Sequence, residues 1–172
     1  MSRTHNTPLG AIGKGLLAGV AGTAAMTAWQ ELAAKLQSPG GGEGAESDRS
    51  TPNPWEVAPA PARVAKLIGE RVFHLEVPAE KIGFLTNAMH WGTGTGWGAV
   101  YGLLAATRRR STPRNGLAFG TIVWGASYAQ LVPLGIYEPP WKYPPRVLAF
   151  DISYHLVYGG ATALAFAVLS DR

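Results

Sequence analysis

The longest uncharged stretch of the chain is residues 82–107, which read IGFLTNAMHWGTGTGWGAVYGLLAAT. Residues 115–137 and 147–170 form two similar runs, and Asp151 is the one charged residue inside the three runs. Each run is longer than the about 20 helical residues that cross a hydrocarbon layer of about 30 Å. A helix on the surface of a water-soluble protein would carry a charged face, and these runs carry none. They therefore predict membrane-spanning helices.

The first apolar segment is shorter and has two interpretations. Its basic start, short apolar core and small residues at 25–28 are typical of a secretory signal peptide. Against this, Gly15, Gly19 and Gly22 share one helical face in the small-xxx-small pattern of packed membrane helices, and Lys14 can snorkel to the interface. We expect a retained span over residues 9–35.

With further spans over 82–106, 116–137 and 147–169, the sequence predicts an all-α, four-helix integral membrane bundle. The bundle would form a single domain over residues 1–172. A mean hydropathy of +0.04 would also suit a globular protein, so the prediction rests on where the charges stand. Pro133 predicts a kink near the outer end of the third span.

Two further elements are predicted between the first two spans. Residues 38–54 are rich in glycine, proline and serine and have little to bury, which indicates a flexible linker. Residues 59–73 have helical periodicity, with Val64 and Ile68 facing one way and Lys66 and Glu70 another. This amphipathic helix in the first outer loop would lie on the membrane surface or pack over the loop side of the bundle.

The arginines of one short loop predict the orientation. Residues 107–115 contain no acid and four arginines, namely Arg108, Arg109, Arg110 and Arg114. Arginines close to span ends are retained in the cytoplasm. We therefore expect the inner (cytoplasmic) membrane as the location, with the N and C termini on the cytoplasmic side.

A weak internal repeat has two interpretations. Gly15 and Gly19 correspond to Gly116 and Gly120, and His90 precedes a glycine by four residues as His155 precedes Gly159. The match predicts two helical hairpins related by an axis along the membrane normal, or it is a chance match of small residues. Gly92, Gly96 and Gly159 are, with the glycines of the first span, the residues expected to pack helices together.

Three ionisable residues within the spans, His90, Asp151 and His155, are the candidate site. Intramembrane ionisable groups are costly and mark function by default. Asp151 and His155 are four residues apart and share a helical face, so with His90 they could hold or pass a proton. In the competing interpretation Asp151 pairs with Arg146 or Lys142 at the interface and the histidines are interhelical hydrogen-bond donors. A b-type haem between the two histidines, or a zinc site with Asp151, is a weaker alternative.

The histidine-bearing spans resemble the YagU-like family of uncharacterised bacterial inner-membrane proteins. The resemblance rests on His90 with Tyr101-Gly102 later in its span, on the Pro140-Trp141 turn, and on Asp151 four residues before His155-Leu156-Val157. It covers the second to fourth spans. It implies an inner-membrane location and a shared histidine and carboxylate arrangement, without an established reaction.

No motif in the sequence indicates an enzyme. There is no cysteine, no serine, histidine and acid arrangement and no phosphate-binding loop, and the basic residues stand mainly at membrane boundaries, which disfavours a nucleic-acid partner. We expect a structural or accessory protein that packs with other membrane subunits or with itself. The alternatives are a small proton-linked transporter or channel-like element, and a haem-binding component.

Overall fold

The structure, a computed structural model, describes residues 7–37, 53–107 and 113–170, and these are helical without a β-strand. Two 3-10 turns, η1 (Ala79–Lys81) and η2 (Pro140–Lys142), precede the third and fifth helices. The five α-helices of the described part are α1 (Pro8–Gln37), α2 (Ala60–Val72), α3 (Ile82–Ala106), α4 (Pro113–Leu131) and α5 (Pro145–Ser170).

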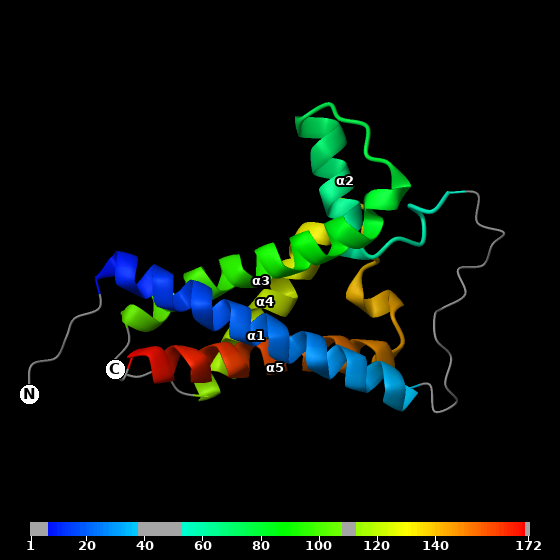
Figure 1. Ribbon diagram of the computed structural model, residues 1–172. Coiled ribbons are helices and arrows are strands. Elements are labelled where there is room, and N and C mark those ends of the chain that lie inside the picture. Colours follow the sequence, from blue (N-terminus) through cyan, green and yellow to red (C-terminus); the bar gives the residue numbers. More distant parts are fainter. Residues whose placement is uncertain (1–6, 38–52, 108–112, 171–172) are drawn as a thin grey trace, which may run out of the picture.

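Four long helices run side by side, with α1 and α5 in the middle. Helix α1 packs along both α3 and α5, and α5 packs on its other side along α4. The start of α1 and the end of α5 lie at the same end of the molecule, and α2 projects near the other end (Figure 1). The predicted linker over 38–54 lies outside the described residues except for Asn53 and Pro54, as do Arg108, Arg109 and Arg110.

Glycines bring the backbones of α1 and α3 into direct contact. A Cβ atom added to Gly19 would lie 2.8 Å from the Gly94 carbonyl oxygen and 2.8 Å from the Gly98 Cα. One added to Gly15 would lie 3.0 Å from the Gly102 Cα. Gly22 faces α5 instead, where an added Cβ would lie 2.9 Å from the Tyr158 carbonyl oxygen. The glycine face predicted on the first span therefore lies in two helix contacts.

The glycines of α4 and α5 meet in a comparable way. A Cβ atom on Gly159 would lie 2.8 Å from the Gly120 Cα, and Gly116 also faces Gly159. A two-fold axis between the hairpins would further require α4 to pack on α3 as α1 packs on α5. Helices α3 and α4 instead meet through aromatic side chains, with Phe119 centred 5.0 Å from Tyr101 and 6.1 Å from Trp97. The two halves of the chain are therefore alike only in the glycine contacts within each helix pair, α1 with α3 and α4 with α5.

Gly92 and Gly96 were predicted to pack helices together, but they contact no other helix of the described part of the chain. A Cβ atom at either position would meet nothing within 4 Å. The glycines of α3 that contact α1 are Gly94, Gly98 and Gly102, two residues further along. Two residues correspond to about 200° around a helix of 3.6 residues per turn, so the predicted pair lies on the opposite face.

The large aliphatic side chains of the described residues lie mostly on the surface of the bundle and not in its core. Within the described residues no leucine or isoleucine is buried, and the large buried side chains are mostly aromatic. Exposed apolar residues instead cover the outer faces, including Leu17 at 62%, Ile122 at 59% and Leu164 at 64% exposure. The core therefore consists of backbone contacts, small residues and a few rings, namely Tyr101, Phe119, Tyr158 and Phe166.

Two of the four long helices are long and apolar enough to cross a membrane, and they are α1 and α5. From the sequence, the first span was the least secure of the four predicted membrane helices. Helices α3 and α4 are instead the two that do not combine the length and hydropathy expected of a membrane span. In α3 the strongly apolar residues are separated by glycines, threonines, Asn87 and His90, and α4 has Arg114 and Asn115 in its first turn. Absence of charge is not the same property as strong hydrophobicity.

Helix α4 ends earlier than predicted. It stops at Leu131 and does not continue through Pro133 to Tyr137, so the expected kink is wrong. Pro133 has no backbone N–H to continue the helical ladder, and the chain turns through Gly135, whose φ of +68° suits glycine. Backbone bonds from Ile136 and Tyr137 to the Leu131 carbonyl oxygen close this turn.

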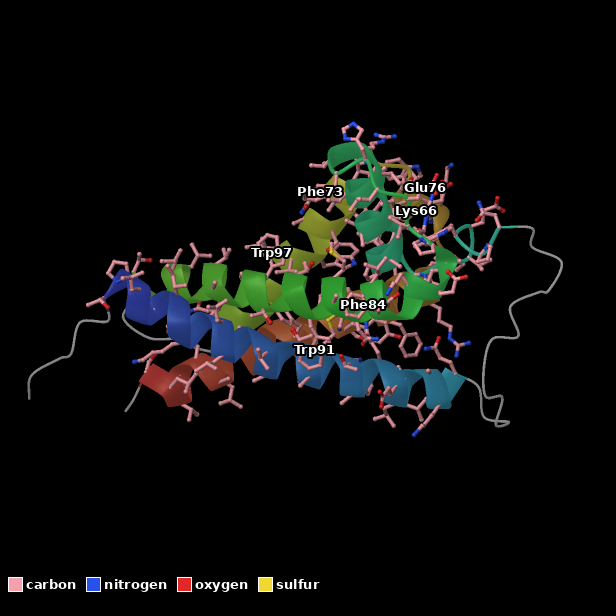
Figure 2. The ribbon with its side chains drawn as sticks, turned by 45° about the horizontal axis from the view of Figure 1, so that its top comes forward. Lys66, Phe73, Glu76, Phe84, Trp91 and Trp97 are labelled. Carbon is pink, nitrogen blue, oxygen red and sulfur yellow. The ribbon has the colours of Figure 1, made fainter. Side chains whose placement is uncertain are left out.

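Helix α2 forms where the periodicity predicted it and packs against α3. Arg63 donates hydrogen bonds of 3.1 Å to the carbonyl oxygens of Gly135 and Ile136, which ties α2 to the turn after α4. The near part of α2 therefore packs over the bundle. Phe73, which follows the last residue of α2, is 64% exposed (Figure 2).

Candidate functional site

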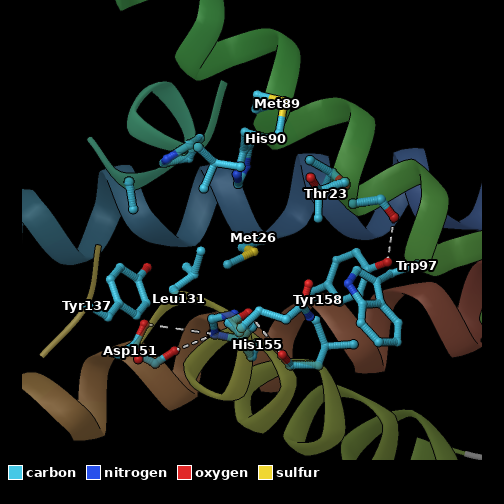
Figure 3. A pocket seen from close by; sticks show the side chains of 18 of the residues that line it. Thr23, Met26, Met89, His90, Trp97, Leu131, Tyr137, Asp151, His155 and Tyr158 are labelled. Carbon is cyan, nitrogen blue, oxygen red and sulfur yellow. Dashed lines mark hydrogen bonds and ion pairs between the residues drawn. The ribbon is translucent and has the colours of Figure 1, made fainter. Parts of the chain in front are cut away.

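The three candidate residues line one cavity. It measures about 470 Å³, within the range of small-molecule sites, and lies between α3 on one side and α4 and α5 on the other. His90 projects into it from α3, and Asp151 and His155 from α5, with Met26 between the two histidines (Figure 3). The first half of each helix supplies these residues, so they lie toward the end of the bundle that carries α2.

Asp151 is held by two donors from α4. Its Oδ2 atom accepts a 2.7 Å hydrogen bond from Trp124 Nε1 and a 2.9 Å bond from the Tyr128 hydroxyl. Both donors are neutral, so they orient the carboxylate without cancelling its charge. The side chain is 23% exposed, toward the cavity.

The interfacial ion pair considered for Asp151 is not present. Lys142 pairs with Glu138 at 2.7 Å, and the Arg146 guanidinium lies over the Phe150 ring at 6.0 Å. The alternative in which a basic residue of the outer loop neutralises Asp151 is therefore wrong for this structure.

The backbone contact of His155 defines its tautomer. Its Nδ1 atom lies 2.9 Å from the Asp151 carbonyl oxygen, and a carbonyl oxygen can only accept a hydrogen bond. Nδ1 must therefore carry a proton, and in the neutral ring Nε2 carries the lone pair. The same Nδ1 lies 4.0 Å from Asp151 Oδ1, so ring and carboxylate are adjacent.

His90 is joined to α1. Its Nε2 atom lies 3.2 Å from the Thr27 hydroxyl, which links α3 to α1 beside the cavity. This is the interhelical hydrogen bond that the structural interpretation of the histidines expects. His90 nevertheless lines the cavity as well, so the bond and a role in the site are compatible.

Sequence reasoning missed the residues that support the site. Trp124 and Tyr128 are four residues apart in α4, share a helical face and both carry hydrogen-bond donors on aromatic rings, which was a usable signal. No comparable sequence pattern indicated that Thr27 contacts His90 or that the Tyr158 ring lines the cavity. The Tyr158 hydroxyl donates a 2.6 Å bond to the Gly94 carbonyl oxygen, which places its ring between α5 and α3.

The described residues hold no group of three or more histidine, cysteine and acidic side chains arranged to bind a metal ion. His90, Asp151 and His155 thus share a cavity without forming a zinc site. Haem b stays a prediction, and an absent Soret band in the purified protein would reject it.

No family model matches the chain, and no curated protein or solved structure is significantly similar to it. The resemblance to YagU-like proteins therefore stays a prediction.

Proposed function

We propose that the protein is an integral membrane protein that crosses the inner membrane with α1, α3, α4 and α5. The exposed aliphatic faces support this, because apolar surface of this extent is costly in water and suits lipid. Only 33% of the most apolar window of α1 and 28% of that of α5 is buried, whereas the core helix of a soluble protein would be mostly buried. Even α4, with 19 residues, is about 28 Å long and close to the hydrocarbon thickness.

The proposed orientation has both termini in the cytoplasm. Arg114 is exposed at the start of α4, in the arginine loop that the positive-inside rule assigns to that side. The start of α1 and the end of α5 lie at one end of the bundle, as this topology requires (Figure 1). The cavity would then lie in the outer half of the membrane, covered by α2.

For the function itself we propose a small proton-linked transport or permeation element. The observation that carries it is that His90, Asp151 and His155 line one ligand-sized cavity from two different helices. His155 Nε2 can accept a proton, and Asp151 lies beside the ring to balance the resulting charge. The other titratable side chains facing Asp151 or lining its cavity are Tyr128, Tyr137 and Tyr158.

Proton flux into proteoliposomes tests this proposal. The protein is reconstituted, a pH gradient is applied in the presence of a potassium ionophore, and an enclosed pH-sensitive dye reports proton entry. We expect Asp151→Asn and His155→Ala to abolish the protein-dependent flux. Glu76→Gln and His74→Asn are matched controls, since the two residues are exposed and outside the cavity, and Asn tolerates the φ of +54° at residue 74.

Folding of each variant is checked by gel filtration and circular dichroism. Flux that is equal in the wild type, the two site variants and empty vesicles would reject the proton-linked function. Loss of flux in the control variants to the same degree would reject the assignment to these residues.

A structural or accessory role is the second candidate, and one observation favours it. Gly92 and Gly96 leave a smooth, unfilled strip on the outward face of α3, where another membrane helix could approach closely. Replacing both with isoleucine should abolish co-purification of a partner or self-association while leaving the monomer folded. An unchanged assembly state in that variant would reject this role for α3.

A further inference from the structure

We propose that the cavity binds a monovalent lipophilic organic cation. This inference rests on the proposed function only because both take the cavity as a ligand site. The charge of the lining is the first argument. Within the described part of the chain, the cavity is lined by one carboxylate, Asp151, and by no lysine or arginine. An anionic ligand would meet an uncompensated like charge there, whereas a single positive charge would be balanced.

Basic residues on the elements around the cavity have other partners. Arg63 of α2 donates to backbone carbonyl oxygens of the turn after α4, and Lys142 pairs with Glu138. Arg146 lies over the Phe150 ring. A partly buried carboxylate that only neutral donors hold is costly unless a proton or a cation accompanies it. While His90 and His155 are neutral, the site therefore lacks a counter-ion, which a cationic ligand would supply in place of a proton on His155.

Aromatic rings provide the second argument. Trp97, Tyr137 and Tyr158 line the same cavity as Asp151 (Figure 3). Faces of tryptophan and tyrosine rings attract organic cations, and do so more strongly when water is displaced. The Tyr158 ring is 2% exposed and is held by its bond to the Gly94 carbonyl oxygen, so the half-buried rings of Trp97 and Tyr137 are the ones a ligand can contact most directly.

The rest of the lining predicts that the cation is lipophilic. Met26 and Met89 contribute flexible, polarisable thioethers, and α2 contributes Val64 and Ile68. Thr93, Ser127 and Gln130 add oxygen atoms to the lining, but a volume of about 470 Å³ suits a drug-sized organic molecule rather than a single inorganic ion.

Two probes of nearly equal size and shape but opposite charge test this proposal. Tetraphenylphosphonium and tetraphenylborate are titrated separately into the full-length protein in mild detergent, and binding is measured by calorimetry. We expect saturable binding of the phosphonium at one site per chain and no saturable binding of the borate. Asp151→Asn should weaken phosphonium binding at least tenfold, and Glu76→Gln, at an exposed residue outside the cavity, should leave it unchanged.

A second variant keeps the test decisive if Asp151→Asn does not fold. Tyr137 lies in the turn beyond α4, so Tyr137→Leu should fold while removing one cavity ring, and it should weaken phosphonium binding severalfold. Equal binding of both probes, or phosphonium binding that neither variant changes, would overturn the proposal.

The outcome is separable from that of the proton assay. Proton flux that depends on Asp151, without phosphonium binding, would overturn the cation site and leave the proposed function intact. Phosphonium binding that depends on Asp151, without proton flux, would support the site and reject proton-linked transport.

Discussion

Replacing Gly19 by alanine should separate α1 from α3. The added Cβ would lie 2.8 Å from the Gly94 carbonyl oxygen and from the Gly98 Cα, and 3.0 Å from the Thr95 carbonyl oxygen. All three are backbone atoms and cannot rotate away. Ordinary contact begins at 3.4 Å, so the helices must move apart by about 0.6 Å.

A shift of this size has a calculable cost. A gap of about 0.5–1 Å between packed atoms loses a quarter to a half of the dispersion energy of each contact. Overpacking of this kind lowers the free energy of unfolding by about 1–3 kcal/mol. Alanine also gains up to about 1 kcal/mol over glycine in helix propensity. Gly13→Ala in the same helix has the same gain and no clash, because nothing lies within 4 Å of its Cβ. The difference between the two variants therefore isolates the steric cost.

The free energy of unfolding is measured for both variants in mixed detergent micelles, with denaturing detergent as the perturbant. We expect Gly13→Ala to be as stable as the wild type or up to about 1 kcal/mol more stable. Gly19→Ala should be less stable than Gly13→Ala by about 1–3 kcal/mol. Equal stability of the two variants would refute the backbone contact between α1 and α3.

Three other perturbations address the cavity and the core. Tyr128→Phe removes one hydrogen bond to the Asp151 carboxylate and should lower the free energy of unfolding by about 1.5–3 kcal/mol, but by less in an Asp151→Ala background; equal losses would contradict the bond. Arg63→Gln should speed amide hydrogen exchange in α2 because it frees the helix from the turn after α4, whereas Lys66→Gln, which breaks a surface pair with Glu70, should change exchange little. Phe119→Ala should cost about 3–5 kcal/mol of unfolding free energy, while Phe84→Ala, at a side chain 70% exposed, should cost under about 1 kcal/mol in detergent; similar losses would contradict the assignment of core and surface.

The long helices and the composition of the site could be predicted from the sequence for identifiable reasons. Uncharged runs bounded by charges located α3 and α5 closely, and the i, i+4 spacing brought Asp151 and His155 together. The face of α3 that packs was wrong because glycines at 92, 94, 96, 98 and 102 occupy both sides of the helix. Composition cannot then distinguish the faces.

The partners of Asp151 could not be predicted in the same way. Sequence proximity favoured Arg146 and Lys142, which are five and nine residues away, yet the bonds come from Trp124 and Tyr128 on a different helix. Which helix neighbours which is a tertiary property. The end of α4 depended likewise on a turn that Arg63 of α2 stabilises from outside the helix.

The central position of α1 constrains the order in which the protein can assemble. Its glycine face is divided between α3 and α5, and α5 begins about a hundred residues after α1 ends. During synthesis α1 can pair with α3 first, but the Gly22 side of α1 has no partner helix until α5 has been made. In the proposed membrane topology, Gly22 would until then expose backbone to lipid. Helix α5 therefore completes the packing of α1. A nascent chain stalled before α5 would leave the Gly22 side of α1 open to any other helix able to approach closely.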